Sequence, residues 1–294
     1  MDSCFRKRNI IKYNLTQTLV DFEYAKKLNE LPGKVKCHIK VDTGMNRIGH
    51  KIQEVETFKK MFELKNLNIL GIYSHLCRVR EFDEESNNYT KMQLDNFKTI
   101  VNQLEKDGYN LGYKHIMSSL GILRFNDEQY NMVRSGILLY GINPEPLNEQ
   151  MEKVFEINHL KPCASFKCKV VSTKIIEKGE KISYGSKYTA KEKTKIAAIT
   201  VGYADGFPFA LFENGFSVII KGNLCPIVGR VCMDCTIVKI PMDSDIKEGD
   251  IVIIFGFDEN GNPLNYKEFF SKAGKIYEET ICQFSELITK IYHL

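Results

Sequence analysis

Cationic and imidazole side chains recur near the ends of predicted strands in the first half of this 294-residue sequence. Lys40 and Arg47 lie seven residues apart in HIKVDTGMNR, His75 ends GIYSH, and Arg134 lies in MVRSGILLYG. Arginine offers a planar set of donors and holds its own proton too tightly to transfer it. Two unmodified cations such as Lys40 and Arg47 repel each other, which gives a physical motive for removing one charge. By itself, a histidine that follows a strand, such as His75, is more often a packing residue than a functional one.

Two motifs of the second half also carry reactive side chains. Tyr184, in ISYGSKY, can act as a base only if nearby positive charge lowers its pKa from about 10; otherwise it is a strand residue packed on a glycine turn. Cys232 and Cys235 form a C-x-x-C, but no second C-x-x-C or histidine pair accompanies them. Both cysteines lie in a predicted strand, where residues three apart face opposite sides. We therefore expect no metal and no redox centre.

Composition excludes several classes of function. The formal charge is +4, with lysine and glutamate mixed throughout, so a basic strip for nucleic acid is not expected. No apolar run approaches the ~20 residues of a membrane span, and the first residues lack a signal-peptide core. Nine cysteines, an odd number, do not make a disulfide scaffold in a chain of this size. We expect reduced thiols and a cytoplasmic protein without membrane contact.

The first half alternates short strand-like runs with amphipathic helical stretches, which predicts βα units and a parallel sheet. The expected strands are 16–22, 35–42, 68–74, 114–119 and 132–140. Helical spacing relates Val55, Phe58, Met61 and Phe62, and again Leu94, Phe97, Val101 and Leu104. Each helix should cover one face of the sheet.

The pattern changes near NPEPL at 143–147, which marks a domain boundary followed by a connecting segment to about His159. From Ala164 onward the runs are strand-like, as in SFKCKVVSTKII, KIAAITVGY, FSVIIKG, CPIVGRVC, TIVKI and DIVIIFG. A short helix is expected around 266–273. The domains are therefore placed at 1–145 and 155–294, the second mainly β.

A series of motifs in constant order identifies a family. HIKVDTGMNRIG is followed by GIYSHL, HIMSSLGILR and MVRSGILLYGINP, and then by ISYGSKYTA, VGYADGF, CPIVGRVCMDCTIV and IYEETIC. Together they resemble the alanine racemases, which depend on pyridoxal phosphate (PLP). The resemblance implies a β/α barrel that holds PLP, a C-terminal β-domain and a head-to-tail homodimer.

The expected barrel is incomplete. The family carries PLP on a lysine in a K-A-x-A-Y-G motif upstream of HIKVDTG, and this sequence contains no such motif. A full β/α barrel has eight strands and about 250 residues, whereas only five strand candidates precede the β-domain here. The fold class expected is thus an incomplete TIM-type barrel of about five strands plus a mainly-β domain. A truncated gene product and a reading frame started at an internal Met both fit.

The resemblance assigns roles to residues that match its motifs. Tyr184 matches the base on the L-alanine face, contributed across the dimer interface. Arg134 matches the partner of the PLP ring nitrogen, and His75 supports that environment. Arg47 faces the substrate carboxylate, and Lys40 matches a lysine that the family often carbamylates, so that it becomes an anion able to hold Arg47.

Further residues match family positions that bind the phosphate, bind the substrate or line the entrance to the site. Phosphate binding falls to Ser119, the backbone at Gly136 and Ile137, and the Tyr277 hydroxyl. The sequence departs from the family at Leu120, where alanine is usual, and at Ser135, where proline is usual. The remaining matches are a backbone contact to the substrate carboxylate at Met233 and two entrance residues, Tyr203 and Asp205.

Three functions remain open on the sequence. The first is a PLP-dependent alanine racemase polypeptide that interconverts L- and D-alanine for peptidoglycan synthesis, with the activity of the isolated chain in doubt. The second is a non-catalytic remnant or a partner subunit of an intact racemase. The third is half of a split enzyme whose first strands are encoded separately. No other lysine replaces the missing one, because Lys181 and Lys187 belong to the β-domain motif and Lys40 matches another role.

Overall fold

The computed structural model describes residues 9–125, 130–142, 160–258 and 260–292. The chain divides into two compact units, the first formed by residues 1–138 and 144–158 and the second by 139–143 and 159–294. Each unit is described by itself. The predicted boundary at 143–147 and the connecting segment to His159 lie outside the described residues. No helix in the described part of the chain is long and apolar enough to cross a membrane.

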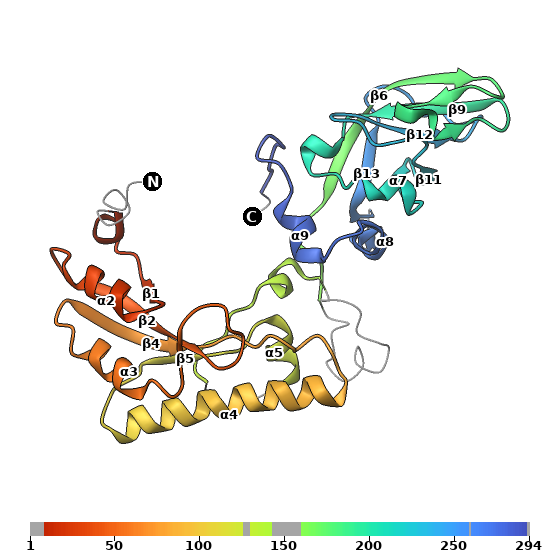
Figure 1. Ribbon diagram of the computed structural model, residues 1–294. Helices are drawn as coiled ribbons and strands as arrows, with labels where there is room; N and C mark the ends of the chain where they lie inside the picture. The colour runs from red at the N-terminus through yellow and green to blue at the C-terminus, as the bar shows by residue number, and fades with distance from the viewer. Residues whose placement is uncertain (1–8, 126–129, 143–159, 259, 293–294) are drawn as a thin grey trace. The chain divides into compact units, whose positions relative to one another are not determined.

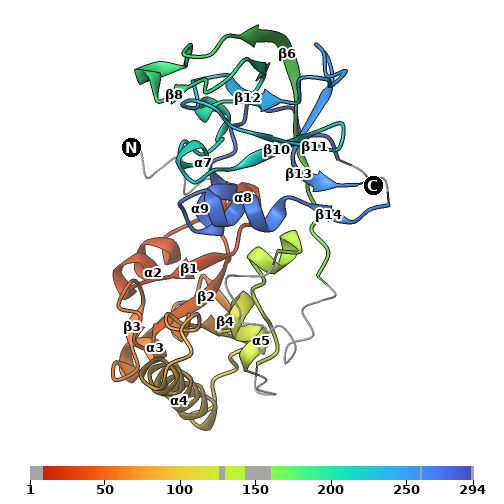
Figure 2. The same ribbon diagram turned by 90° about the vertical axis from the view of Figure 1, so that its right-hand side faces the viewer.

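A five-stranded parallel sheet forms the centre of the first unit. Its strands are β1 (Gln17–Leu19), β2 (Val35–Asp42), β3 (His50–Lys51), β4 (Leu67–Tyr73) and β5 (Tyr113–His115). The order is β1-β2-β4-β5, with β3 paired to β2, and the recorded pairings are all parallel. The helices α2 (Phe22–Asn29), α3 (Val55–Phe62) and α4 (Glu84–Lys106) lie together along one side of this sheet (Figures 1 and 2).

The alternation of β2 decides which side chains the helices cover. Cys37, Ile39 and Val41 are fully buried in the hydrophobic core. Because successive side chains of a strand point to opposite faces, His38 and Lys40 lie on the other face of the sheet. The candidate site residue Lys40 therefore shares with His38 the face that is turned away from the helices.

Predictions for the first half were confirmed where periodicity was strong. The strand predicted at 35–42 is β2 with the same bounds, the strand predicted at 68–74 is β4, and the two helical spacings lie in α3 and α4. The strand predicted at 16–22 ends at Leu19, because the Asp21 side chain accepts from the backbone N–H of Tyr24 and caps α2.

The last two predicted strands of the barrel were partly wrong. The strand predicted at 114–119 ends at His115, and Ser119 begins α5 (Ser119–Arg124). The segment 132–140 is not a strand: it runs without ladder pairing into a 3₁₀ turn, η1 (Ile137–Tyr140). The N–H groups of Gly136 and Leu138 donate to the Ser119 hydroxyl, at 2.9 and 3.5 Å, so a side chain satisfies them in place of a neighbouring strand.

Antiparallel strands build the second unit, which confirms the predicted mainly-β domain. The main sheet holds β6 (Phe166–Ile176), β9 (Thr194–Ile199), β10 (Ser217–Ile220), β11 (Asn223–Pro226), β12 (Thr236–Ile240), β13 (Ile251–Phe257) and β14 (Pro263–Leu264). Its order is β11-β10-β13-β6-β9-β12, with β14 paired to β13. The strands β7 (Lys181–Ile182) and β8 (Tyr188–Thr189) form a separate ribbon. The helices are α7 (Ala210–Glu213), α8 (Tyr266–Lys272) and α9 (Tyr277–Cys282).

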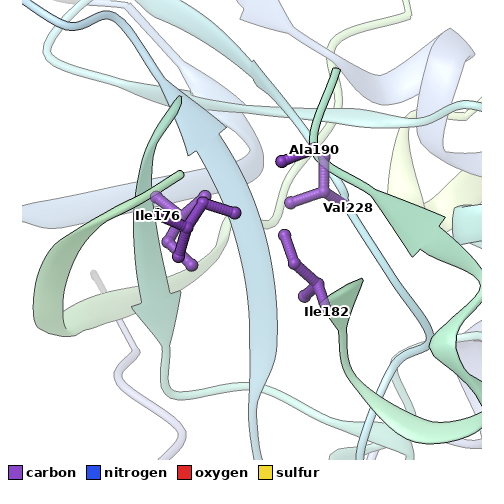
Figure 3. Packing of buried hydrophobic residues seen from close by; sticks show 5 residues of the cluster. Ile176, Ile182, Ala190 and Val228 are labelled. Carbon is purple, nitrogen blue, oxygen red and sulfur yellow. The ribbon is translucent and has the colours of Figure 1, made fainter. Parts of the chain in front are cut away.

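Apolar packing fixes the β7–β8 ribbon to the main sheet. Ile182 and Ala190, from the ribbon and its flank, pack with Ile176, Ile196 and Val228 in one buried cluster (Figure 3). Burying an aliphatic side chain of this size contributes roughly 1.5–3 kcal/mol. This packing therefore holds the backbone at Ile182, and with it the start of the next turn, against the main sheet.

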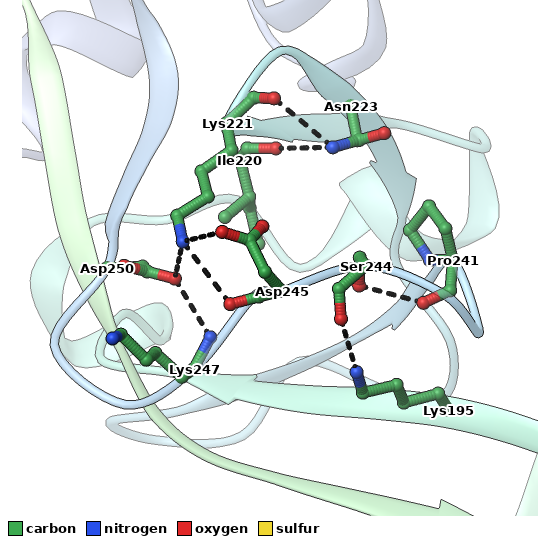
Figure 4. A network of polar contacts seen from close by, with 9 residues as sticks. All are labelled: Lys195, Ile220, Lys221, Asn223, Pro241, Ser244, Asp245, Lys247 and Asp250. Atoms are coloured by element: carbon green, nitrogen blue, oxygen red, sulfur yellow. Dashed lines mark hydrogen bonds and ion pairs between the residues drawn. The ribbon is translucent and has the colours of Figure 1, made fainter.

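A polar network holds a corner of the same unit. The Lys221 amine contacts the Asp245 carboxylate at 2.9 Å and the Asp250 carboxylate at 3.1 Å, and Asp250 also accepts from the N–H of Lys247 at 2.8 Å (Figure 4). These contacts join the β10–β11 turn to the loop before β13. Ion pairs at the surface each contribute only about 0–1 kcal/mol to the free energy of unfolding. The main effect of this network is therefore to hold the two loops in place.

Candidate active-site elements of the two units

Strand register aligns two rows of side chains on the face of the first sheet that is turned away from the helices. Lys40 of β2 pairs with Tyr73 of β4, which pairs with His115 of β5. The Lys40 amine lies 5.5 Å from the Tyr73 ring centre, and the Tyr73 and His115 rings stack at 4.8 Å with an interplanar angle of 6°. The neighbouring row contains His38. Parallel pairing thus places residues from distant motifs side by side.

Arg134 reaches this face from the segment after α5, with its guanidinium 5.0 Å from the Tyr73 ring centre. One terminal nitrogen, Nη2, donates to the Ser74 carbonyl at 2.7 Å and to Nδ1 of His75 at 3.2 Å. The other, Nη1, hydrogen-bonds Nδ1 of His115. In the described part of the chain its recorded partners are neutral, and burial lowers the pKa of Arg134. A half-buried guanidinium without a carboxylate partner keeps its positive charge available to a ligand.

His75 lies beside that guanidinium, as expected for a residue supporting it. Burial, then the charges of Arg134, Arg47 and Lys40, lowers the pKa of His75 to about 4. The imidazole is therefore neutral near pH 7, and its Nδ1 accepts from the arginine.

Lys40 is 3% exposed, and its amine donates to the Val41 carbonyl at 2.6 Å. Burial is the largest influence on its pKa, which is lowered to about 8; Asp42 opposes this shift, while Arg134 and Arg47 add to it. A substantial neutral fraction of the amine exists just above neutral pH. Only a neutral amine can react with carbon dioxide, so the environment suits carbamylation.

The loop that carries Arg47 is braced by α4. The Asp42 carboxylate accepts from the N–H groups of Gly44 and Asn46, both at 3.0 Å, which closes a tight turn. From α4, the Tyr89 hydroxyl donates to the Gly44 carbonyl at 2.7 Å. Arg47 itself is exposed at the end of this braced turn.

Buried Gln93 extends the same brace to His75. Its amide nitrogen donates to the His75 carbonyl at 3.1 Å, and its amide oxygen accepts from the N–H of Cys77 at 3.0 Å. Helix α4 thus fixes the backbone from His75 to Cys77.

Two of the residues predicted to bind phosphate, Ser119 and Gly136, are brought together. The Ser119 hydroxyl oxygen accepts from the N–H of Gly136, and its O–H remains able to donate to another group. Ile137 begins the adjoining 3₁₀ turn. Tyr277, the fourth, belongs to the second unit, where it begins α9 and its ring lies 4.9 Å from that of Phe270.

Tyr184 stands on a turn of left-handed residues in the second unit. It is 72% exposed, and it is flanked by Ser183 with φ 61° and Gly185 with φ 70°. The Ser183 hydroxyl donates to the Arg230 carbonyl at 2.7 Å, which ties the turn to the segment before β12. A Cβ on Gly185 would lie 3.4 Å from Nη1 of Arg230, so positive charge adjoins the tyrosine turn.

Met233, Tyr203 and Asp205 form a second contact zone in this unit. The N–H of Tyr203 donates to the Cys232 carbonyl at 3.0 Å, and that of Ala204 to the Met233 carbonyl at 2.9 Å. A Cβ on Gly202 would come within 2.3 Å of the Met233 carbonyl oxygen, so only glycine permits this approach. The Asp205 carboxylate accepts from the N–H of Gly202 at 2.9 Å, and thus caps its own turn.

The reasoning from sequence about Cys232 and Cys235 was wrong in one respect. The two cysteines precede β12 and lie in a turn closed by a hydrogen bond from the Cys232 N–H to the Cys235 carbonyl at 2.9 Å. They therefore share one side of a turn, where a strand would have separated them. Burial and then the neighbouring Cys232 raise the pKa of Cys235. Within the described ranges, no group of three or more His, Cys, Asp or Glu side chains is placed to hold a metal ion.

Tyr73 and His115 contact predicted site residues, and His38 contacts His115; sequence reasoning missed all three. His38 precedes Lys40 by two positions, so strand periodicity alone puts both on one face. His115 begins the HIMSS motif, but its contact with Arg134 depends on the register of β4 with β5.

Comparison with known proteins gives the family. The profile of the alanine racemase N-terminal domain matches residues 6–144, and that of the alanine racemase C-terminal domain matches residues 163–292. An alanine racemase of Methanococcus maripaludis is 35% identical over 289 residues, covering 96% of this chain and 74% of the relative. One of Clostridium tetani is 35% identical over 292 residues, covering 96% and 72%.

Solved structures agree with these relatives. An alanine racemase of Clostridium difficile 630 is 34% identical, with a TM-score of 0.83, and the match covers 95% of this chain and 70% of that chain. An alanine racemase of Bacillus anthracis with bound L-Ala-P is 29% identical, with a TM-score of 0.82. The chain belongs to the alanine racemase family of PLP-dependent isomerases.

Proposed function

We propose that this chain is an alanine racemase polypeptide that contributes to the interconversion of L- and D-alanine with PLP, and so to the supply of D-alanine for peptidoglycan. The observation that supports this most is half-buried Arg134, whose recorded partners in the described residues are neutral imidazoles and carbonyls. Such a guanidinium suits a neutral aromatic nitrogen, because it donates a hydrogen bond and keeps its own proton.

The residues fit the cofactor at two ends. Arg134 and His75 suit the ring nitrogen, and the Ser119 hydroxyl, whose O–H can still donate, suits the phosphate together with the backbone at Gly136 and Ile137. Backbone N–H groups at the ends of barrel strands commonly bind phosphate. We assign the Tyr277 hydroxyl to the phosphate as well.

PLP, when bound to the substrate amine, supplies an electron sink that makes the α-proton of alanine acidic. In the proposal, Tyr184 moves the proton on the L-alanine face through its hydroxyl oxygen. Arg47, held by carbamylated Lys40, and the backbone of Met233 bind the substrate carboxylate. Tyr203 and Asp205 line the entrance. Each of these roles follows the match to the family motifs.

The proposal assigns this chain one of two proton-transfer groups. The sequence contains no K-A-x-A-Y-G motif, and we propose that the isolated chain lacks the lysine that bonds to PLP and serves the opposite face. Loss of one proton-transfer group alone typically costs about 10²–10⁴-fold in rate. We therefore expect little activity from the chain by itself.

Tyr184 needs a second surface to act on a substrate, because it is 72% exposed on its own unit. We propose that the chain dimerises, with itself or with an intact racemase subunit, and that Tyr184 serves the partner's cofactor.

The described cysteines are all free thiols, which supports a reducing cytoplasm.

Subunit mixing tests the proposal. The 294-residue chain is mixed with a lysine-bearing racemase subunit whose own catalytic tyrosine has been replaced by phenylalanine, and D-alanine formation is measured. We expect activity with the unmodified chain and none above background with its Tyr184→Phe variant. Activity no higher than that of the mutated partner alone contradicts the proposal and leaves a non-catalytic remnant.

A further inference from the structure

The face that holds Arg134 contains an unbroken series of hydrogen bonds, and no assigned role uses the part of it that runs from His38 to His115. Nδ1 of His38 lies 2.8 Å from Nε2 of His115, whose Nδ1 contacts Arg134. Arg134 in turn contacts His75. Three imidazoles and one guanidinium are thus linked in a line across β2, β4 and β5.

Protonation in this line follows from one fact, that a guanidinium only donates. Nδ1 of His115 must therefore carry a lone pair toward Arg134, and the proton of the neutral ring sits on Nε2. That Nε2–H donates to Nδ1 of His38, so the proton of neutral His38 sits on its own Nε2. Each ring admits one tautomer while the line is intact.

Burial and the positive charge of Arg134 favour the same neutral tautomers of His115 and His38. Burial, followed by the charge of Arg134 and then by His38, lowers the pKa of His115 to about 3. Burial and Arg134 also lower the pKa of His38. Neither ring gains a proton near neutral pH, so His115 remains an acceptor for the arginine.

The absence of a side chain at Gly71 makes room for the His38 ring. His38 pairs with Gly71 of β4, which pairs with Tyr113 of β5. A Cβ on Gly71 would lie 2.7 Å from Cε1 and Nδ1 of the His38 ring. The ring therefore leans across β4 over the bare glycine, to reach His115 and to stack on Tyr113 at 6.2 Å with an interplanar angle of 14°.

We propose that His38 is a positioning residue: by accepting from Nε2–H of His115, it stabilises the tautomer and ring orientation that Arg134 requires, and so holds Arg134 as an oriented donor toward the cofactor ring. The inference rests on the proposed function for the identity of the ligand. The hydrogen-bond line itself is a property of the chain without PLP.

Two substitutions separate the hydrogen bond from the bulk of the ring. His38→Leu removes the acceptor, whereas His38→Asn can place an amide oxygen near the position of Nδ1 and accept from His115. The first readout is nitrogen-15 NMR of the full chain without PLP, which reports the tautomer of His115 and the exchange of the Arg134 guanidinium protons. The second is the dissociation constant for PLP, with circular dichroism as the control for folding.

We expect His115 in the unmodified chain to carry its proton on Nε2. In His38→Leu, guanidinium exchange should be about fivefold to tenfold faster and PLP binding weaker by a similar factor, as for loss of one hydrogen bond; in His38→Asn both should stay within about twofold. A proton on Nδ1 of His115, or unchanged exchange in folded His38→Leu, overturns the inference. If the NMR results hold but neither the chain nor its variants bind PLP, the proposed function fails and the positioning of Arg134 stands.

Discussion

The two units prepare their functional side chains in opposite ways. The first half-buries a charged group, Arg134, and surrounds it with acceptors at the ends of parallel strands and with stacked rings. The second presents Tyr184 to solvent on a short left-handed turn, supported by the Ser183 to Arg230 hydrogen bond and by the apolar cluster around Ile182. The difference teaches that contacts within one unit orient the Arg134 guanidinium, whereas the exposed Tyr184 hydroxyl is left available to a surface that its own unit does not supply.

The largest expected effect separates function from stability in the second unit. Tyr184→Phe should lower activity in the mixed-subunit assay by about 10²–10⁴-fold. The free energy of unfolding should change by less than about 0.5 kcal/mol, because the hydroxyl belongs to an exposed side chain. Denaturant titration beside the activity assay measures both. A large loss of stability would mean that the tyrosine supports its own unit and is not held ready for another.

In the first unit, by contrast, a substitution at the candidate site should reduce both PLP binding and the free energy of unfolding. Arg134→Met leaves the Nδ1 of His115 and the Ser74 carbonyl without their donor, which costs about 2–4 kcal/mol of unfolding free energy. We also expect loss of measurable PLP binding. The matched control is Arg47→Met, which removes an exposed arginine and should change stability by less than about 0.5 kcal/mol. Equal effects of the two substitutions would contradict the contrast between buried and exposed sites.

Acid should destabilise the first unit before the second. The pKa values of His75 and His115 are lowered to about 4 and about 3 in the folded unit, whereas a histidine in the unfolded chain titrates near ~6.5. As pH falls below ~6.5 the unfolded chain takes up protons that the folded unit does not, so stability is lost down to pH ~4. Two such groups would together cost about 7 kcal/mol, which solvent screening of these partly exposed rings reduces to about 2–4 kcal/mol.

Hydrogen exchange of peptides, corrected for intrinsic rates, compares the two units along this pH range. The described part of the second unit contains no histidine, and the lowered pKa values of Asp245 and Asp250 move their titration below the same window. Equal loss of protection in both units between pH 6.5 and 4.5 would rule out the histidines as the cause.

A smaller effect is expected at Lys40. Because its pKa is lowered to about 8, the neutral amine should react with carbon dioxide, forming a carbamate and releasing one proton. Carbon-13 NMR in labelled bicarbonate should show a carbamate signal that grows as pH rises toward 8 and is absent in Lys40→Arg. A signal that survives this substitution would place the modification elsewhere.

Sequence periodicity predicted much of the frame but little of the contact geometry. The apolar alternation of β2 gave its bounds, and the motif order gave the candidate residues. The contact of His115 with Arg134 was not predictable, because strand register across β4 and β5 has no local signal. The segment 132–140 failed as a strand because the Ser119 side chain satisfies its N–H groups, and the Cys232–Cys235 turn was misread because β12 begins later than its apolar run suggests.

Our central proposal is that this chain holds the ring-nitrogen and tyrosine parts of a racemase site without the lysine that bonds to PLP. The most direct test is to add PLP to the full chain, reduce with borohydride, and map modified peptides by mass spectrometry. We predict saturable, reversible PLP binding that Arg134→Met abolishes, and no stoichiometric reduced PLP on any lysine of the first unit. Stoichiometric modification of one such lysine would contradict the claim and show that the chain supplies its own covalent anchor.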